Sequence, residues 1–112
     1  MYFDYIKERE NLDHIATESG FITFRIEGEN CLISDYYVKP EFRRLHKGKF
    51  FADQVLELCK ERGVKFVWCQ SDESANGHEA ARKSILKYGF RESKKYDSVY
   101  TYILRVDEWA KS

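Results

Sequence analysis

The sequence predicts an α/β domain of the α+β type, in which a mixed and largely antiparallel sheet is flanked by helices. Two observations lead to this prediction. Apolar residues alternate with the period of a strand early in the chain, and the period becomes helical from about Gly48 to Arg62. A second helical segment and further strand-like runs follow. The expected order is therefore an N-terminal helix or edge strand, then β, β, β, α, β, α, β, β.

Length and charge limit the function classes. A chain of 112 residues predicts a single domain, residues 1–112. Its 19 basic and 19 acidic side chains cancel, so anion binding has to be local. Three cysteines without a CxxC pair, a start unlike a signal peptide and no long apolar run favour a cytoplasmic, non-membrane protein. The three histidines lack ligand-like spacing, so no metal site is predicted.

The first half of the chain reads mainly as strands. The segment FITFRIEG has Ile22, Phe24 and Ile26 on one face, which is typical of a strand. The run CLISDYYV is β-branched and aromatic, and it stops at Pro40. The expected elements are a helix or an edge strand at 3–12, and strands at 14–19, 21–28 and 31–38, with a hairpin turn at 27–30.

The second half begins with an amphipathic helix. Phe51, Val55 and Leu58 fall at i, i+4 and i+7, and Gly63 is well suited to follow the last turn. The short apolar run at 64–70 predicts a strand covered on both faces. The remaining expected elements are a helix at about 78–88, strands around 90–93 and 98–106, and a connection at 94–97.

A basic cluster lies between the strand at 31–38 and the helix that follows it. The first turn of a helix has free N–H groups and a positive dipole end, and a glycine lets a phosphate approach the backbone. By composition, a phosphate site and a solubilising basic rim explain the cluster equally well. The order strand, loop, basic cluster, glycine, helix favours the phosphate site. The cluster consists of Lys39, Arg43, Arg44, Lys47 and Lys49, with His46 among them.

Two motifs resemble one known family. The stretch YYVKPEFRRLHKGKFFADQVLELCKERG (residues 36–63) resembles the acyl-CoA-binding motif of the GNAT superfamily of N-acyltransferases. A second GNAT signature, a helix that ends in Lys-x-Gly-Phe, matches residues 87–90. The resemblance spans about 14–106 and implies a GNAT-like fold with a shortened N-terminus, similar to short phage or bacterial GNAT proteins. The first motif matches in register at Val38, Pro40, Glu41, Phe42, Arg43 and Gly48.

This resemblance implies acetyl-CoA as the co-substrate and assigns a site. The loop at 43–48 would bind the pyrophosphate, and the end of the strand at 31–38 would pair with the pantetheine arm in a splay beside the strand at 64–70. Asp35 matches a common acidic position and is the predicted general base, although a structural aspartate explains it equally well. The implied cofactor-binding residues are Tyr37, Val38, Arg43, Arg44, Leu45, His46, Lys47, Gly48, Lys49, Asn76 and His78.

The chain departs from the family pattern at two positions. His46 stands where the family usually has glycine, although a backbone N–H survives the change. Ile85 stands where many members have a tyrosine general acid, and isoleucine cannot protonate a leaving thiolate. Tyr88, one turn away, has the register of a core residue. The other tyrosines open as alternatives are Tyr96, Tyr100 and Tyr102.

The expected function is an acetyl-CoA-dependent N-acetyltransferase that acts on a primary amine of an unidentified protein or small molecule. The alternative is a GNAT-fold protein of weak or no activity that acts through protein–protein binding, which Ile85 and His46 favour. Nucleic-acid binding is a weaker hypothesis, because the basic cluster does not extend into a stripe. Only about a dozen residues precede the first strand, so we expect either an open acceptor cleft or a homodimer partner that closes it.

Overall fold

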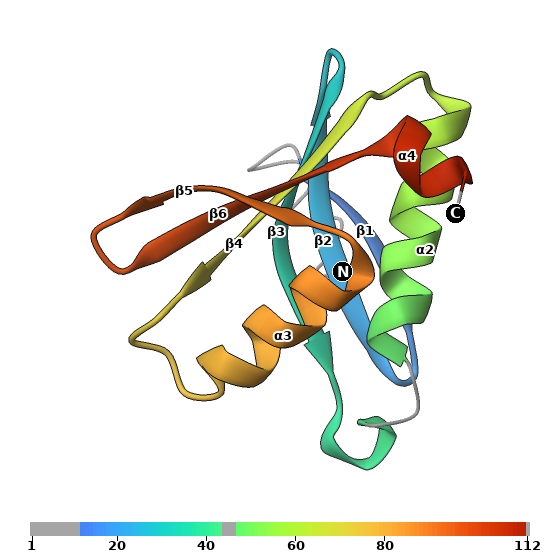
Figure 1. Ribbon diagram of the computed structural model, residues 1–112. Helices are drawn as coiled ribbons and strands as arrows, with labels where there is room; N and C mark the ends of the chain where they lie inside the picture. Colours follow the sequence, from blue (N-terminus) through green and yellow to red (C-terminus); the bar gives the residue numbers. More distant parts are fainter. Residues whose placement is uncertain (1–11, 44–46, 112) are drawn as a thin grey trace.

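A six-stranded sheet forms the centre of the molecule, in the order β1-β2-β3-β4-β6-β5 (Figure 1). The computed structural model describes residues 12–43 and 47–111. β3 and β4 pair in parallel, and the other neighbouring strands pair antiparallel. The strands are β1 (Asp13–Thr17), β2 (Gly20–Glu27), β3 (Asn30–Val38), β4 (Phe66–Asp72), β5 (Arg91–Tyr96) and β6 (Val99–Arg105).

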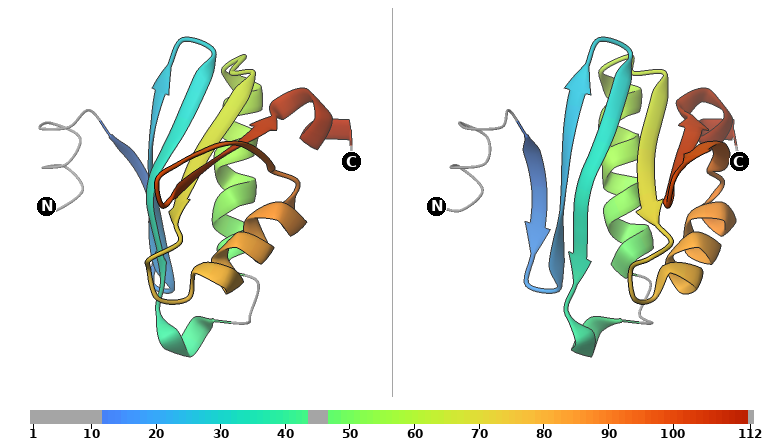
Figure 2. Two further views of the ribbon diagram at one scale, coloured as in Figure 1. Left: turned by 60° about the vertical axis from the view of Figure 1, so that its left-hand side comes forward. Right: turned by 90° about the vertical axis from the view of Figure 1, so that its left-hand side faces the viewer.

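The two long helices lie on the same side of the sheet (Figure 2). The core forms beneath α2, where Phe51, Val55, Leu56 and Cys59 are 0% exposed. These side chains occupy the apolar face that the helical period predicts. No helix in the described ranges is both long enough and apolar enough to cross a bilayer. The helices are η1 (Pro40–Phe42, a 3₁₀ turn), α2 (Lys47–Glu61), α3 (His78–Tyr88) and α4 (Val106–Lys111).

The predicted α+β class and element order are confirmed, with corrections at element boundaries. β1 ends at Thr17 and not at 19, and β4 spans Phe66–Asp72 where a strand at 64–70 is expected. β5 continues through Tyr96, so the expected connection at 94–97 shrinks to a tight turn in which Asp97 has a φ of 52°. The strand expected to reach 106 ends at Arg105, and the short helix α4, which the sequence did not predict, follows. The expected element at 3–12 lies almost entirely outside the described residues.

The only parallel pair in the described sheet opens along its length. β3 and β4 are paired at Asn30–Phe66, Cys31–Val67 and Leu32–Trp68. Within the described residues the pairing stops there, although β3 continues to Val38 and β4 to Asp72. The two strands therefore diverge after Leu32 and Trp68. The unpaired stretch between the two strands, called the cleft below, extends toward the end of β3 that precedes α2.

Candidate active site

The backbone of β3 turns polar groups into the cleft at two residues. A two-residue turn joins Thr17 to Gly20, so the backbone N–H and C=O of Gly20 point toward β1. Because this direction alternates along a strand, the N–H and C=O of Ile22 also point toward β1. Tyr36 lies opposite Ile22 in the β2–β3 register and therefore points its N–H and C=O away from β2. Val38 has the same orientation. The next residue, Lys39, points its backbone the opposite way and donates its N–H to the Ser19 carbonyl oxygen on the β2 side at 2.8 Å, which agrees with this register.

Two side chains bond to these cleft-facing groups. The Asp35 carboxylate accepts a hydrogen bond from the Tyr36 N–H, with Oδ1 at 2.8 Å. The Arg43 guanidinium donates from Nε to the Val38 carbonyl oxygen at 3.0 Å. Arg43 also lies over the Tyr37 ring, 5.9 Å from its centroid. The predicted residues Asp35, Tyr37, Val38 and Arg43 thus gather at one edge of the cleft.

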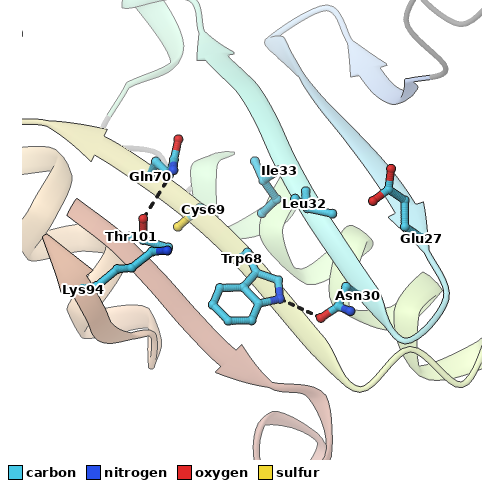
Figure 3. Close-up of a pocket in the computed structure, with 9 residues that line it drawn as sticks. All are labelled: Glu27, Asn30, Leu32, Ile33, Trp68, Cys69, Gln70, Lys94 and Thr101. Atoms are coloured by element: carbon cyan, nitrogen blue, oxygen red, sulfur yellow. Dashed lines mark hydrogen bonds between the residues drawn. The ribbon is translucent and has the colours of Figure 1, made fainter. Parts of the chain in front are cut away.

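A groove of about 460 Å³ lies where the two strands begin to diverge (Figure 3). Trp68 donates its indole N–H to Asn30 Oδ1 at 2.8 Å. Gln70 donates to Thr101 Oγ1 at 3.3 Å, which leaves its amide oxygen as an acceptor. An apolar floor with a few fixed amides suits the binding of a small organic group. The lining residues are Glu27, Asn30, Leu32, Ile33, Trp68, Cys69, Gln70, Lys94 and Thr101.

The N-terminus of α2 lies just beyond the far end of β3. The Tyr36 hydroxyl occupies the space into which a Cβ at position 48 would project. A side chain here would therefore have to displace the end of Tyr36, a contact that the sequence did not predict. Lys49 points along its own helix and pairs with Asp53 at 2.8 Å. Arg44, Leu45 and His46 lie outside the described residues, and of Lys47 only the backbone is described.

A buried polar network lies between the end of β4, β6 and α3. Arg82 donates to the Tyr102 hydroxyl at 3.0 Å and to Glu92 at 2.7 Å. Ser71 Oγ lies 2.7 Å from the Tyr102 hydroxyl and 3.0 Å from His78 Nε2. Every hydroxyl proton has an acceptor when Tyr102 donates to Ser71 and Ser71 donates to His78, whose ring then carries its proton on Nδ1.

This network contains one residue of the predicted site, His78, together with residues that were not predicted for the site. His78, expected at the cofactor, is buried and bonded to Ser71. Asn76 is exposed in the preceding turn. Sequence reasoning missed the roles of Ser71 and Arg82 and left Tyr102 as one of several tyrosines. The i, i+4 spacing of His78 and Arg82 on one helix face was a usable signal.

The position that the family gives to a tyrosine is part of the core here. Ile85 is partly buried and packs against the core cluster. Tyr88, as expected for its register, also packs there, and its hydroxyl donates to Asp53 Oδ1 at 2.7 Å. Burial, and then the bond to Asp53, raise the pKa of Tyr88 well above its usual range. Neither residue offers a proton to the cleft.

The fold and site define a class: an α+β protein whose open parallel strand pair leads to a helix N-terminus. Comparison with family models gives a match to the acetyltransferase (GNAT) family over residues 6–90. Since this match covers most of the chain, the protein belongs to the GNAT family. A search among curated proteins found no match.

Solved structures show the same fold. A GNAT-family acetyltransferase structure from Desulfovibrio desulfuricans matches with a TM-score of 0.79 at 13% identity, over 92% of this chain and 77% of that one. The PaiA N-acetyltransferase of Thermoplasma acidophilum, solved with coenzyme A, gives 0.74 and 19%, over 89% and 65%. Ard1 from Thermoplasma volcanium gives 0.64 and 27%, over 78% and 62%. The chain thus spans less than two thirds of the last two.

Proposed function

We propose that this protein is an acetyl-CoA-dependent N-acetyltransferase that acts on a primary amine. The observation that carries the proposal is the open β3–β4 pair, whose cleft-facing groups at Tyr36 and Val38 lead toward the N-terminus of α2. An extended diamide such as pantetheine can pair with such a strand edge as a further strand would. The CoA complex of the T. acidophilum relative supports the same ligand class.

The residues present fit such a co-substrate. The pyrophosphate would lie at the first turn of α2, where the helix dipole and free N–H groups favour anions. Arg43, whose guanidinium bonds to Val38 at the end of the cleft, is a cation on this edge. The groove at the start of the cleft has room for the thioester end and part of the acceptor. The cofactor supplies an activated acetyl group, and the protein supplies binding and proton transfer.

Proton transfer is assigned to Asp35. A lysine-like amine has a pKa of about 10.4, so at neutral pH it must lose a proton before it can attack a thioester. Asp35 is exposed at the cleft edge and can accept that proton. Ile85 cannot supply the proton for the departing thiolate, and Tyr88 is held by Asp53. We assign the proton for the thiolate to solvent, which the exposed cleft edge admits.

Calorimetry with acetyl-CoA, followed by a thiol-release assay over a panel of amines, tests the proposal. We expect micromolar binding and amine-dependent release of free CoA. Replacing Asp35 by Asn should lower turnover about 100-fold, as for loss of a general base. No heat at millimolar acetyl-CoA would refute the proposal.

The second candidate is a protein that binds through the GNAT fold without transfer, and the packing of Ile85 into the core favours it. Binding of acetyl-CoA without thiol release for any amine would select this candidate. The two functions are thus separated within one experiment.

A further inference from the structure

Two groups on the cleft edge of β3 are bonded to the protein's own side chains. Tyr36 offers an N–H to the cleft and Val38 offers a C=O, and a neighbouring strand would normally bond to both. The Tyr36 N–H donates to the Asp35 carboxylate, and the Val38 carbonyl oxygen accepts from Arg43. These two contacts are called the edge caps below. A ligand carbonyl that pairs with the Tyr36 N–H must replace the Asp35 cap, whereas the Val38 carbonyl oxygen keeps a second lone pair for a ligand N–H.

Both caps come from residues with another task in the proposed function. Asp35 is the assigned base, and Arg43 is a cation at the end of the cleft that leads to α2. We propose that binding of the diamide arm exchanges these partners: a ligand carbonyl takes the Tyr36 N–H and releases the Asp35 carboxylate for proton transfer. This inference rests on the proposed function and adds a ligand-dependent base to it.

The geometry allows this exchange at low cost. Asp35 is an exposed side chain on a β-bulge, where the β2–β3 register shifts between Thr23 and Phe24. Its carboxylate bonds to the residue directly after it, so a rotation about its own side-chain bonds is enough to release it. The Tyr36 N–H loses one acceptor and gains another, so the backbone stays satisfied.

The released carboxylate then acts on the acceptor. One proton passes from the substrate ammonium to an Asp35 carboxylate oxygen, which gives a neutral amine and a carboxylic acid. The amine nitrogen attacks the thioester carbonyl, the C–S bond breaks, and CoA leaves as a thiolate that takes a proton from solvent. The new amide nitrogen gives its second proton to solvent, and the Asp35 proton also returns to solvent before the next turnover. Before the arm binds, the carboxylate is directed at the strand edge. Deprotonation is thereby coupled to the presence of the acetyl donor.

An NMR titration with pantetheine tests the exchange. Pantetheine carries the diamide but no phosphate. Because it is uncharged, removing the negative charge of Asp35 does not change its affinity through charge attraction or repulsion. In the wild-type protein we expect the Tyr36 amide proton resonance to shift on binding. Asp35→Ala removes the competing cap and should bind pantetheine about three- to tenfold tighter, in line with the loss of one hydrogen bond. Asp35→Asn keeps a weaker acceptor and should fall between the two.

Glu18→Ala is the matched control. Glu18 is an exposed carboxylate in the turn between β1 and β2, outside the stretch that resembles the acyl-CoA-binding motif, and its removal should leave the affinity for pantetheine unchanged. Turnover with acetyl-CoA should fall in both Asp35 variants, although binding becomes tighter. A merely structural aspartate would give weaker or unchanged binding when replaced.

The outcomes separate the inference from the function beneath it. If the wild-type protein binds neither CoA nor pantetheine, the proposed function fails. If it binds them and Asp35→Ala binds no tighter, or the Tyr36 amide does not respond, the exchange is wrong and the proposed function stands. The wild-type titration decides the point even if a variant does not fold.

Discussion

At Gly48 the backbone of α2, a side chain of β3 and the proposed phosphate meet. A Cβ there would meet only the Tyr36 hydroxyl, the far end of a side chain that is 53% exposed. Tyr36 can swing away, and alanine is the better helix former. We therefore expect Gly48→Ala to change the free energy of unfolding by less than about 1 kcal/mol, measured by urea denaturation. Its affinity for CoA should fall at least about tenfold, because the backbone near the anion becomes less accessible.

Tyr36→Phe supplies the control for Gly48. It removes the hydroxyl that a new Cβ would meet and leaves the ring in place. If the double variant Tyr36→Phe/Gly48→Ala stays weak for CoA, the glycine is required by the ligand. Recovery of affinity in the double variant would show that the tyrosine contact alone explains the residue at position 48.

The sequence predicted which residues gather at the cleft but not how they are bonded. Tyr37, Val38 and Arg43 follow from a strand, a proline and a loop that are contiguous in the chain. The bond from the Tyr36 N–H to Asp35 depends on which edge of β3 is free, and only the pairing of β2 with both neighbours defines that edge. Register of this kind comes from tertiary pairing and leaves little signal in a single strand.

At the scale of elements, the network around Ser71 ties β4 and β6 to α3. Tyr102 is fully buried, and Ser71 is its acceptor while also donating to His78. Ser71→Ala leaves a buried hydroxyl proton without an acceptor and His78 Nε2 without a donor. We expect a loss of about 1–3 kcal/mol in the free energy of unfolding, measured by chemical denaturation.

The double variant Ser71→Ala/Tyr102→Phe checks that the network acts as a unit. Removing both hydroxyls also removes the buried proton that lacks an acceptor. The double variant should therefore lose less stability than the two single variants added together. Additive losses would mean that the two hydroxyls contribute independently.

Element prediction succeeded where burial follows a period and failed where it does not. α2 shows a clear apolar face, and its predicted limits agree with the structure to within about one residue at each end. All six residues of β5 are exposed, so no alternation marks its second half, and pairing with β6 alone makes it a strand. α4 depends on Trp109 packing against the core, although Asp107 and Glu108 suit a helix start.

At the scale of the whole molecule, the sequence says more about the kind of ligand that the protein binds than about the identity of the acceptor. The equal numbers of acids and bases directed attention to one local basic cluster, and the anion site there remains a prediction. The groove could not be predicted, because its lining comes from five separate strands, β2 to β6. The acceptor depends on that lining, and contacts between distant segments are not readable from periodicity.

The free energy of unfolding should fall in alkaline solution, and we expect the Cys69 thiol to cause a measurable part of this fall. Burial raises the pKa of the Cys69 thiol from its ordinary value of 9.0 to about 12. Between these values the unfolded chain has lost a proton that the folded chain keeps, so unfolding becomes easier as pH rises, by up to about 1.4 kcal/mol per pH unit. Below pH 9 this contribution is fully present and the thiol adds no slope.

Urea denaturation of wild-type and Cys69→Ala proteins under reducing conditions, between pH 8 and 11, should show a shallower decline for the variant. Cys69→Ala also loses some packing, so the comparison is between slopes and not between absolute stabilities. Equal slopes would mean that the folded protein releases the Cys69 proton as readily as the unfolded chain.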